Sequence, residues 1–580
     1  MSNSLAGGLF RAAFALTLTC CASAAPAQQL PPNLPRHLPV PPFHRRGPVL
    51  DIPASDAAAA RFLTMATFGP NQTDISLLRQ IGYRAWIKQQ LALPATLQRS
   101  YVESLDQAVQ NPGNADRMEV WFNNSLTAPD QLRQRMAWAL SQIMVTSDQF
   151  VNQDPIALAE YYDILARDAA GYVDGAGAAH APTYSNLLHD VTLSPAMAKM
   201  LTYLRNQKGD PNKGTSPDEN YAREVMQLFS IGLVLLNPDG SQKLDLSGQP
   251  IPTYTQATIT SYAKVFTGWS YSTGFNTNPA NYQNWSTAEY LPLVCYAQYH
   301  DTSAKTLLSY TGNYTAGSDA QSLPANNGCE NDLAQGLQII ANHPNVAPFI
   351  SRQLIQRFVT SNPTPGYISR VATTFTASGG DLSQVITAIL TDSEALTGTV
   401  MDAGYVFGKA REPLLKLTAL WRYYHASATA GLYTFTNPQT SYLERPLGAT
   451  SVFNFYSPSY LPPGELGDAG LFGPEFQILN ESTVASAAND LTSRSNAYIG
   501  NSNNKAETIA IDISTLTAIA ADANMLADQI NHDLLCGSMS AVMKASLVQL
   551  INTLPATNPA TRAQAALQAV LISPEFAIQK

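Results

Sequence analysis

The chain has 580 residues, a mass of 62.5 kDa and a formal charge of −9, and charged residues make up only 13% of it. Average globular proteins carry about 25% charged residues, so uncharged polar side chains supply much of this surface, which suits a secreted protein. The acidic charge and the lack of a long basic run exclude a nucleic-acid-binding surface, because phosphate binding needs clustered Lys and Arg. The length allows one large core or several cores that share interfaces.

The first 50 residues have the pattern of a leader and a tether. Residues 1–27 contain one Arg, then an apolar run, then small residues that end in Ala25-Pro26-Ala27. This pattern predicts a cleaved secretory signal, and a lipid anchor is disfavoured because Thr19 precedes Cys20. Residues 28–50 are rich in Pro and are expected to form an extended linker. No later stretch reaches the roughly 18 apolar residues of a membrane span, so we expect a soluble protein in the periplasm or outside the cell.

Residues 51–580 are predicted to form a mainly α, multi-helical body with small β-hairpin and loop insertions. Apolar residues recur there with helical spacing, and Ser, Thr or Asp often precedes the first turn. Helices are also expected from residue 330 to the end, except around 454–474. The helices predicted before residue 269 span residues 55–68, 73–81, 85–91, 115–125, 129–145, 155–167, 195–205, 217–231 and 255–267.

The segment 269–329 differs from the rest of the body. It is rich in Tyr, Trp, Asn, Ser and Gly and has few charged residues, so we expect a long irregular segment with short strands. Its aromatic rings could form a platform for sugar rings, although packing beneath a loop is the favoured interpretation. In an oxidising compartment Cys295 and Cys329 are expected to form a disulfide, which leaves Cys536 unpaired. No paired Cys spacing indicates a metal site.

The stretch PDENYAREVMQLFSIGL, residues 217–233, begins with carboxylates and continues as an amphipathic helix. Ser216, Pro217 and Glu219 predict a capping box with Pro at the first helical position, so the charged start has a structural explanation. The polar face beyond it could meet water, form a buried network or line a cleft. At helical spacing that face contains Asn220, Arg223, Glu224 and Gln227.

A second candidate cluster follows in the irregular segment. His300 and Asp301 stand next to each other, with Lys305 four residues later and Tyr299 just before them. A His near carboxylates can act as a general base or bind a metal, provided that a second carboxylate or His lies within reach. His343 is a further binding candidate, although its place before Pro344 favours capping or packing.

Several motifs in order along the chain resemble those of one family. They are RFLTMATFGP at 61–70, LRQRMAWALSQI at 132–143, PDENYAREVMQLFSIGL at 217–233, FTGW at 266–269, HDTSAK at 300–305, NHPNVAPFI at 342–350, SVFNFYSP at 451–458 and SPEF at 573–576. As a set they are similar to the bacterial family catalogued as domain of unknown function 1800 (DUF1800). The resemblance covers residues 58–580.

The resemblance implies a secreted, mainly helical protein. It does not imply any particular activity. It also implies a possible partner, because such proteins are often encoded beside a sulfatase-like family, domain of unknown function 1501 (DUF1501). Some relatives carry Trp-His-Asn-His after the Arg-Met pair, whereas this chain has Trp138-Ala139-Leu140-Ser141. A metal role based on those histidines therefore does not transfer to this chain.

These observations lead to three hypotheses of function. The first is an exported protein that binds or processes an envelope polymer such as a polysaccharide, together with a sulfatase-like partner. The second is a hydrolytic or metal-assisted enzyme whose site joins Arg223 and Glu224 to His300 and Asp301. The third is a structural or assembly factor for secreted complexes. The signatures of zinc proteases, nucleotide enzymes, serine hydrolases and cytochromes c are absent from the sequence, which leaves any cofactor unknown.

Overall fold

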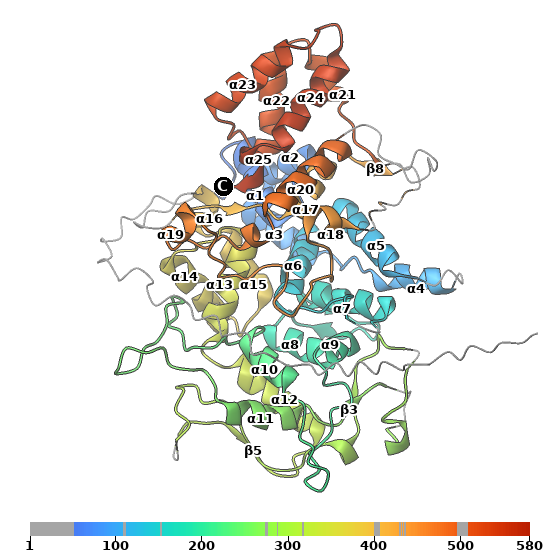
Figure 1. Cartoon of the computed structure of the whole chain (residues 1–580), viewed down its shortest axis with the longest axis vertical. Helices are drawn as coiled ribbons and strands as arrows, with labels where there is room; N and C mark the ends of the chain where they lie inside the picture. Colours follow the sequence, from blue (N-terminus) through green and yellow to red (C-terminus); the bar gives the residue numbers. More distant parts are fainter. Residues whose placement is uncertain are drawn as a thin grey trace, which may run out of the picture. The chain divides into compact units, whose positions relative to one another are not determined.

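The fold is described from a computed structural model of the chain (Figure 1). The described residues are 51–107, 112–150, 153–272, 277–286, 288–315, 318–398, 406–428, 437–495 and 509–580, with Gly431, Tyr433 and Phe435. The chain divides into two units, residues 1–43 and 44–580, and every described residue belongs to the second. The predicted leader and linker lie outside the described residues.

The first third of the described chain is helical except for one small hairpin. Its helices are α1 (Asp56–Ala66), α2 (Gln72–Ile81), α3 (Tyr83–Ala92), α4 (Arg99–Gln107), α5 (Asn114–Thr127), α6 (Gln131–Ser141), α7 (Pro155–Asp168), α8 (Tyr184–Leu193) and α9 (Pro195–Met200). Strands β1 (Tyr172–Val173) and β2 (Ala179–His180) pair antiparallel between α7 and α8.

Side-chain caps explain where several of these helices begin. The side chains of Ser55, Asn71, Asp154 and Thr183 each accept a backbone N–H in the first turn of α1, α2, α7 and α8. Such caps satisfy donors that have no partner within the helix. The predicted helix at 195–205 is shorter in the structure, because Thr202 and Arg205 adopt positive φ values of 61° and 63° that helices exclude.

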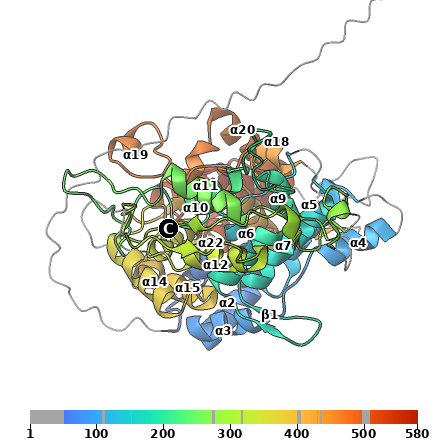
Figure 2. The same ribbon diagram turned by 90° about the horizontal axis from the view of Figure 1, so that it is seen from below.

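The middle of the chain joins three short helices through irregular segments. These are α10 (Asn220–Gln227), α11 (Gln256–Val265) and α12 (Cys329–Ala341), with the 3-10 helices η1 (Pro279–Asn281) and η2 (Ala297–Tyr299). Strand β3 (Trp269–Ser270) pairs with β4 (Val294–Cys295), and β5 (Lys305–Thr306) pairs with β6 (Ser322–Leu323). Figure 2 shows α10 and α11, which pack against each other. The predicted irregular segment with short strands is therefore present where the structure describes it.

The last part of the chain returns to helices. They are α13 (Val346–Phe358), α14 (Pro365–Ala377), α15 (Leu382–Leu390), α16 (Ser393–Thr397), α17 (Pro413–Tyr423), α18 (Pro438–Tyr442), α19 (Glu465–Asp468), η3 (Pro474–Gln477), α20 (Glu481–Arg494), α21 (Ser514–Ile519), α22 (Ala523–Leu535), α23 (Ala541–Asn552), α24 (Pro559–Leu571) and α25 (Pro574–Ala577). Strand β7 (Lys409–Ala410) pairs with β10 (Ile578–Gln579), and β8 (Ser427–Ala428) pairs with β9 (Ile509–Ala510).

The core is organised around helices that are buried on every side. All residues of α6 are buried, and α7 is buried along most of its length. The ring of Trp121 packs against Phe68, Phe122 and Trp138, with centroids 5.0 to 5.3 Å apart. Because buried rings of this size remove a large apolar area from water, this cluster fixes α5 and α6 to the start of the chain. The predicted mainly α class is confirmed.

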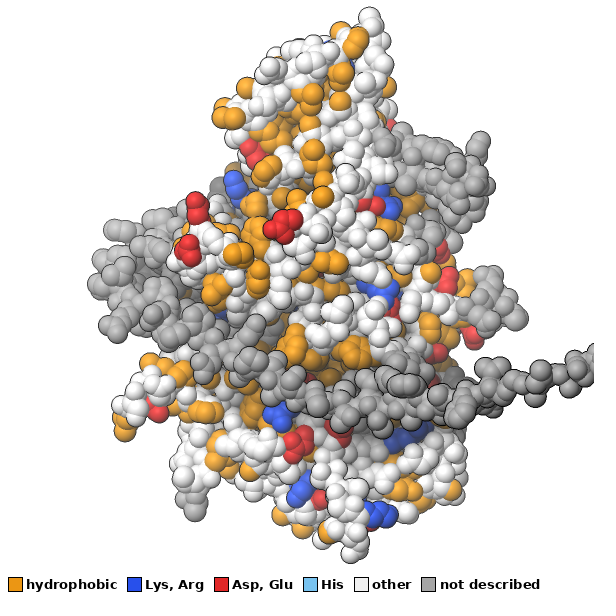
Figure 3. All heavy atoms as spheres, in the orientation of Figure 1, with side chains coloured by type: hydrophobic (Ala, Val, Ile, Leu, Met, Phe, Trp, Pro, Cys, Tyr) orange, Lys and Arg blue, Asp and Glu red, His pale blue; other side chains and the backbone are white. Residues whose placement is uncertain are grey.

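The surface of the described residues carries few charges. In Figure 3 the Lys, Arg, Asp and Glu side chains stand in small separate groups among uncharged atoms. No helix among the described residues is long and apolar enough to cross a membrane.

Candidate functional site

The polar face of α10 is present, but the helix begins later than predicted. The backbone N–H of Asp218 donates to Asn206 Oδ1 at 2.8 Å, and Asp218 Oδ1 accepts from the N–H of Asn220 at 2.8 Å. These bonds hold residues 217–219 in a turn, so Pro217 precedes the helix. Glu219 makes no cap bond, since its carboxylate binds Gln256 and Thr260 of α11. The predicted capping box is therefore wrong.

Three predicted residues of this face are partly exposed and already hydrogen-bonded. Asn220 Nδ2 donates to Thr202 Oγ1 at 3.3 Å, and Gln227 Oε1 accepts from Tyr254 Oη at 3.4 Å. Arg223 lies 3.6 Å from the Glu219 carboxylate and donates to Gln256 at 3.4 Å. Arg223 therefore pairs with Glu219 across one turn and not with its chain neighbour Glu224.

Glu224 is the exception on this helix. Its side chain is 7% exposed, and its buried Oε2 atom has no hydrogen-bond partner among the described residues. Burial raises the pKa of Glu224 to about 7, although the charge of Arg223 acts in the opposite direction. A carboxyl with this pKa exchanges its proton near neutral pH, as a general acid or base does.

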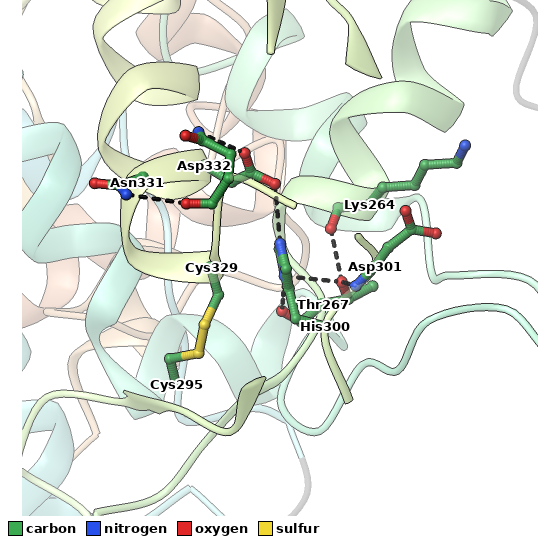
Figure 4. The surroundings of a disulfide bond; sticks show 9 residues. Lys264, Thr267, Cys295, His300, Asp301, Cys329, Asn331 and Asp332 are labelled. Atoms are coloured by element: carbon green, nitrogen blue, oxygen red, sulfur yellow. Dashed lines mark hydrogen bonds and ion pairs between the residues drawn. A yellow bond between two sulfur atoms is a disulfide. The ribbon is translucent and has the colours of Figure 1, made fainter. Parts of the chain in front are cut away.

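His300 points at a carboxylate that the sequence did not single out (Figure 4), and Lys305 binds the same carboxylate. His300 Nε2 lies 2.9 Å and Lys305 Nζ 2.6 Å from Oδ2 of Asp332, which belongs to α12. His300 Nδ1 donates to the Thr267 carbonyl at 2.9 Å. All three charged side chains are 1% exposed. Both ring nitrogens of His300 are thus engaged in the interior, and neither is free to exchange a proton with a ligand.

Asp301 does not join that cluster. Its carboxylate accepts from the backbone N–H and the hydroxyl of Ser303 at 2.9 and 2.5 Å. Burial acts to raise the pKa of Asp301, but the Ser303 bonds and the charges of Lys264 and Lys305 outweigh it and leave the pKa lowered. In Figure 4 the side chains of His300 and Asp301 point in different directions. The predicted site would join His300 and Asp301 to Arg223 and Glu224. Among the described residues, no contact links the first pair to the second.

The disulfide is present as predicted. Cys295 and Cys329 are bonded, with Cα atoms 6.3 Å apart and a sequence separation of 34. Because Cys329 opens α12, the bond fixes the turn that carries Asp332 (Figure 4). Cys536 is a free cysteine, 3.8 Å from Thr64 Oγ1, and burial raises the pKa of its thiol.

The remaining predicted binding residues have packing contacts. Nδ1 of the buried His343 accepts from the N–H of Asn345 at 3.1 Å, and its ring meets Tyr310 edge-on at 5.3 Å. Burial lowers the pKa of His343 to about 4, so this ring is neutral at ordinary pH. Tyr299 stacks on Tyr282 at 3.9 Å and donates to the Pro279 carbonyl.

The aromatic segment divides between core and surface. Four of its rings are 2% exposed or less, namely Trp269, Tyr271, Tyr282 and Tyr296. Trp285 is 61% exposed, with the guanidinium of Arg205 4.7 Å from its ring centre. Packing beneath a loop is therefore the role of most of these rings.

A polar hollow that the sequence analysis did not predict lies between α2, α5 and α17. It consists of two adjoining cavities of about 200 and 190 Å³ that share Asn71, Leu126, Thr127 and Arg422. Trp86 and Gln131 line the first, and Trp421, His425 and Tyr433 line the second. The buried atoms Gln131 Oε1 and Trp421 Nε1 have no partner among the described residues.

Arg422 divides the two cavities and is firmly held. Its Nη2 lies 2.8 Å from Asp74 Oδ2, its Nε donates to the Gly69 carbonyl at 2.8 Å, and its Nη1 donates to the Leu126 carbonyl at 2.9 Å. Asn71 and Asp74 lie at the start of α2, so helix capping is enough to account for them in the sequence. The available signal for the hollow was Arg422, in a helix at 413–423 that is mostly apolar apart from Lys416 and Thr418.

A buried charged network surrounds Glu412, just before α17. Glu412 Oε2 accepts from Trp138 Nε1 at 2.6 Å and Gln142 Nε2 at 2.8 Å, and Lys409 lies between Glu412 at 3.4 Å and Glu475 at 2.9 Å. Burial would raise the pKa of Glu412, but the charges of Lys409 and Arg135 hold it at about 2. Trp138 therefore holds this carboxylate in place. It is the first residue of Trp138-Ala139-Leu140-Ser141, where some relatives have Trp-His-Asn-His.

Comparison with known proteins agrees with the motifs. The family model described as "Protein of unknown function (DUF1800)" matches residues 61–578. The chain belongs to this family. Both the α10 residues and the Glu412 network lie within the matched DUF1800 range. A search of curated proteins and of solved structures found no match.

Proposed function

We propose that this DUF1800 protein is exported and binds an uncharged polysaccharide of the cell envelope in the hollow beside Arg422. The leader pattern of residues 1–27 and the low content of charged residues support export. The family resemblance also suggests a sulfatase-like partner. A mainly α scaffold with a surface hollow suits a binding role, since ligand sites are concave and combine rings with a few polar groups.

The observation that carries this proposal is the chemistry of the hollow. Trp86, Trp421 and Tyr433 lie in its wall, where they are 1%, 1% and 8% exposed. Asn71 and Gln131 contribute amides. Sugars present hydroxyl groups around an apolar ring face, so aromatic rings and planar polar groups are complementary to them. The free acceptor on Gln131 and the free donor on Trp421 match the dual character of a hydroxyl group.

The charges of the hollow favour an uncharged polymer. Asp74 neutralises Arg422 at 2.8 Å, and the Arg422 guanidinium is fully occupied by that bond and by backbone carbonyls. An acidic polysaccharide would have to compete with Asp74 for this guanidinium. A neutral chain leaves the ion pair intact and uses the amides and rings.

Blocking the hollow tests the proposal. Thr127 is exposed at the end of α5 and lines both cavities, so Thr127→Trp fills the space without entering the core. The matched control is Thr373→Trp, on the exposed face of α14. We expect the wild type and the control to be retarded in native gels that contain neutral bacterial polysaccharides, and Thr127→Trp to migrate freely. Equal migration of all three proteins in every polysaccharide would refute the proposal.

Glu224 supports a second candidate, a hydrolase that acts on such a polymer. Its unpartnered Oε2 and its pKa of about 7 make it a proton donor or acceptor at neutral pH. The test is release of reducing ends from the polysaccharide by the wild type, Glu224→Gln and Glu219→Gln. Loss of activity in Glu224→Gln alone, with an unchanged melting temperature, supports catalysis. Unchanged release in Glu224→Gln rejects it.

A further inference from the structure

We infer that the start of α17 holds a small oxyanion, such as phosphate or sulfate, between the side chains of Arg411 and Lys416. This site is separate from the hollow at the other end of the same helix and does not depend on the proposed polysaccharide binding. Arg411 directly precedes the N-cap residue Glu412, and Lys416 is the fourth residue of α17. The inference rests on their burial, their lack of partners and the charges around them.

Both side chains are buried without a counter-ion. Each residue is 7% exposed, and neither side chain makes a hydrogen bond or ion pair to any residue that the structure describes. Among the described residues, the Arg411 guanidinium lies 4.7 Å from the centre of the Phe576 ring, and the Cys536 thiol is near enough to affect its pKa. Buried cations in proteins are normally paired with an anion, because an unpaired charge is costly to move out of water. The nitrogen atoms of Arg411 and Lys416 are not among the fully buried atoms without a partner, so water reaches them, and a small anion can replace that water.

The surrounding interior has a surplus of positive charge. The buried cations near the start of α17 are Arg135, Arg357, Lys409, Arg411 and Lys416. The buried carboxyls near them are Glu412, Glu444 and Glu475. Burial and the charge of Glu412 raise the pKa of Glu444 well above its ordinary value, which favours its neutral form. Even if all three carboxyls were ionised, cations would outnumber them.

The helix itself adds to the positive potential. The N-terminal end of an α-helix carries about half a positive charge, which favours anions and disfavours a cation in the first turns. Lys416 occupies this unfavourable position in α17. Burial and the charge of Arg411 lower the pKa of Lys416 to about 8, with Glu444 acting weakly in the opposite direction. An anion at this end of the helix offsets the repulsion that Lys416 experiences from the helix N-terminus and from Arg411.

The side chains present suit an oxyanion in particular. The Arg411 guanidinium offers a planar set of N–H donors that can bind two oxygens together, and the Lys416 ammonium offers a point charge with three donors. Glu444 caps α17 by accepting the N–H of Leu414 at 3.2 Å, and its buried Oε1 has no partner. When protonated, this carboxyl can donate to an oxyanion. No group of metal-binding residues exists among the described residues, so a metal is not the missing ion.

The test compares inorganic phosphate and sulfate with chloride, on the full chain and at matched ionic strength. Binding to the folded state alone raises the melting temperature in proportion to the logarithm of the anion concentration above Kd. We expect this logarithmic rise in the wild type and in Lys88→Met, which removes an exposed Lys. We expect it to be lost in Lys416→Met and Arg411→Met. General salting-out by sulfate would act on all four proteins equally.

Equilibrium dialysis of the wild type with labelled phosphate decides the matter if either variant fails to fold. Saturation at a single phosphate per chain, competed by sulfate and not by chloride, supports the site. The inference is overturned if the wild type binds no phosphate at millimolar concentration. It is also overturned if Lys416→Met and Arg411→Met fold and keep the full shift in melting temperature.

Discussion

The cluster around Asp332 and the start of α17 each bury two basic side chains, but only the cluster supplies a carboxylate that binds both. In the first, Asp332 lies within 3 Å of both His300 Nε2 and Lys305 Nζ. The remaining Lys305 hydrogens bind the carbonyls of Asp301 and Ser303 at 2.8 and 2.9 Å. At the start of α17 neither Arg411 nor Lys416 has such a partner among the described residues.

This difference separates structural charge from charge that is available to a ligand. A buried cation whose donors are all satisfied within the chain contributes to the fold and has nothing left to bind with. A buried cation without partners costs free energy in the empty protein, and a ligand that supplies the partners recovers it. Burial alone therefore does not identify a site, whereas burial combined with missing partners does.

The largest expected effect comes from breaking the balanced cluster. Asp332→Asn leaves His300 and Lys305 buried without a carboxylate, and removal of one partner of a buried pair costs about 3–5 kcal/mol. We expect a loss of this size in the free energy of unfolding, measured by urea denaturation. Asp301→Asn is the control, since that carboxylate binds only Ser303 through the contacts described above. Similar losses in both variants would show that the contacts of Asp332 contribute no more to the free energy of unfolding than those of Asp301.

The disulfide is expected to have the next largest effect. Cys295→Ser with Cys329→Ser removes a bond between residues 34 apart and frees the turn that carries Asp332. Disulfides of native proteins contribute about 2–4 kcal/mol, mainly by restricting the unfolded chain. A lower free energy of unfolding is therefore expected, with reductant having no further effect on the double variant. If reductant alone leaves the wild type unchanged in stability, the bond does not stabilise this region.

Glu224 extends the comparison to a buried carboxyl without a full set of partners. Its folded pKa of about 7 lies above the ordinary value of 4.5, so the folded state keeps a proton that the unfolded state releases. The free energy of unfolding should therefore fall as pH rises from about 4.5 to 7, by about 2 kcal/mol. Glu224→Gln should be more stable than the wild type at pH 8 and similar to it at pH 4. Parallel pH curves for the two proteins would contradict the raised pKa.

Lys416→Met is expected to have the smallest effect, and one of opposite sign to Asp332→Asn. In anion-free buffer at pH 7 it removes an unpaired buried charge and should raise the free energy of unfolding by about 1 kcal/mol. The folded pKa of Lys416, about 8, lies below its ordinary 10.5, so the unfolded state binds more protons between these values. Wild-type stability should rise with pH across that window and approach that of the variant. A destabilised variant in chloride buffer would show that Lys416 has a partner within the protein.

Patterns that depend on near neighbours in sequence were predictable. Helical spacing and cap residues indicated the mainly α class and the approximate positions of α1, α5, α7 and α11, and Cys spacing indicated the disulfide. The capping box of α10 failed because Asn206, distant in sequence, binds the N–H of Asp218 and keeps Pro217 outside the helix. A local pattern cannot show such competition from elsewhere in the chain.

The sites themselves could not be predicted, because each joins residues that are far apart in sequence. Asp332 reaches His300 across 32 residues, and Asp74 reaches Arg422 across 348. The lack of a partner for Arg411 or Lys416 is a property of everything packed around them, and no residue type or spacing records it. The sequence pattern grouped His300 with Lys305. It did not identify Asp332, the carboxylate that binds both.

The pairing of β7 with β10 governs when the protein can finish folding. Residues 409–410 bind residues 578–579, and the buried Gln579 side chain donates to the carbonyls of Phe358 and Val359. Strand β7 therefore stays without its partner strand until residues 578–579 have been synthesised. Contacts between segments so far apart in sequence form slowly, so we expect this pairing to be a late step of folding.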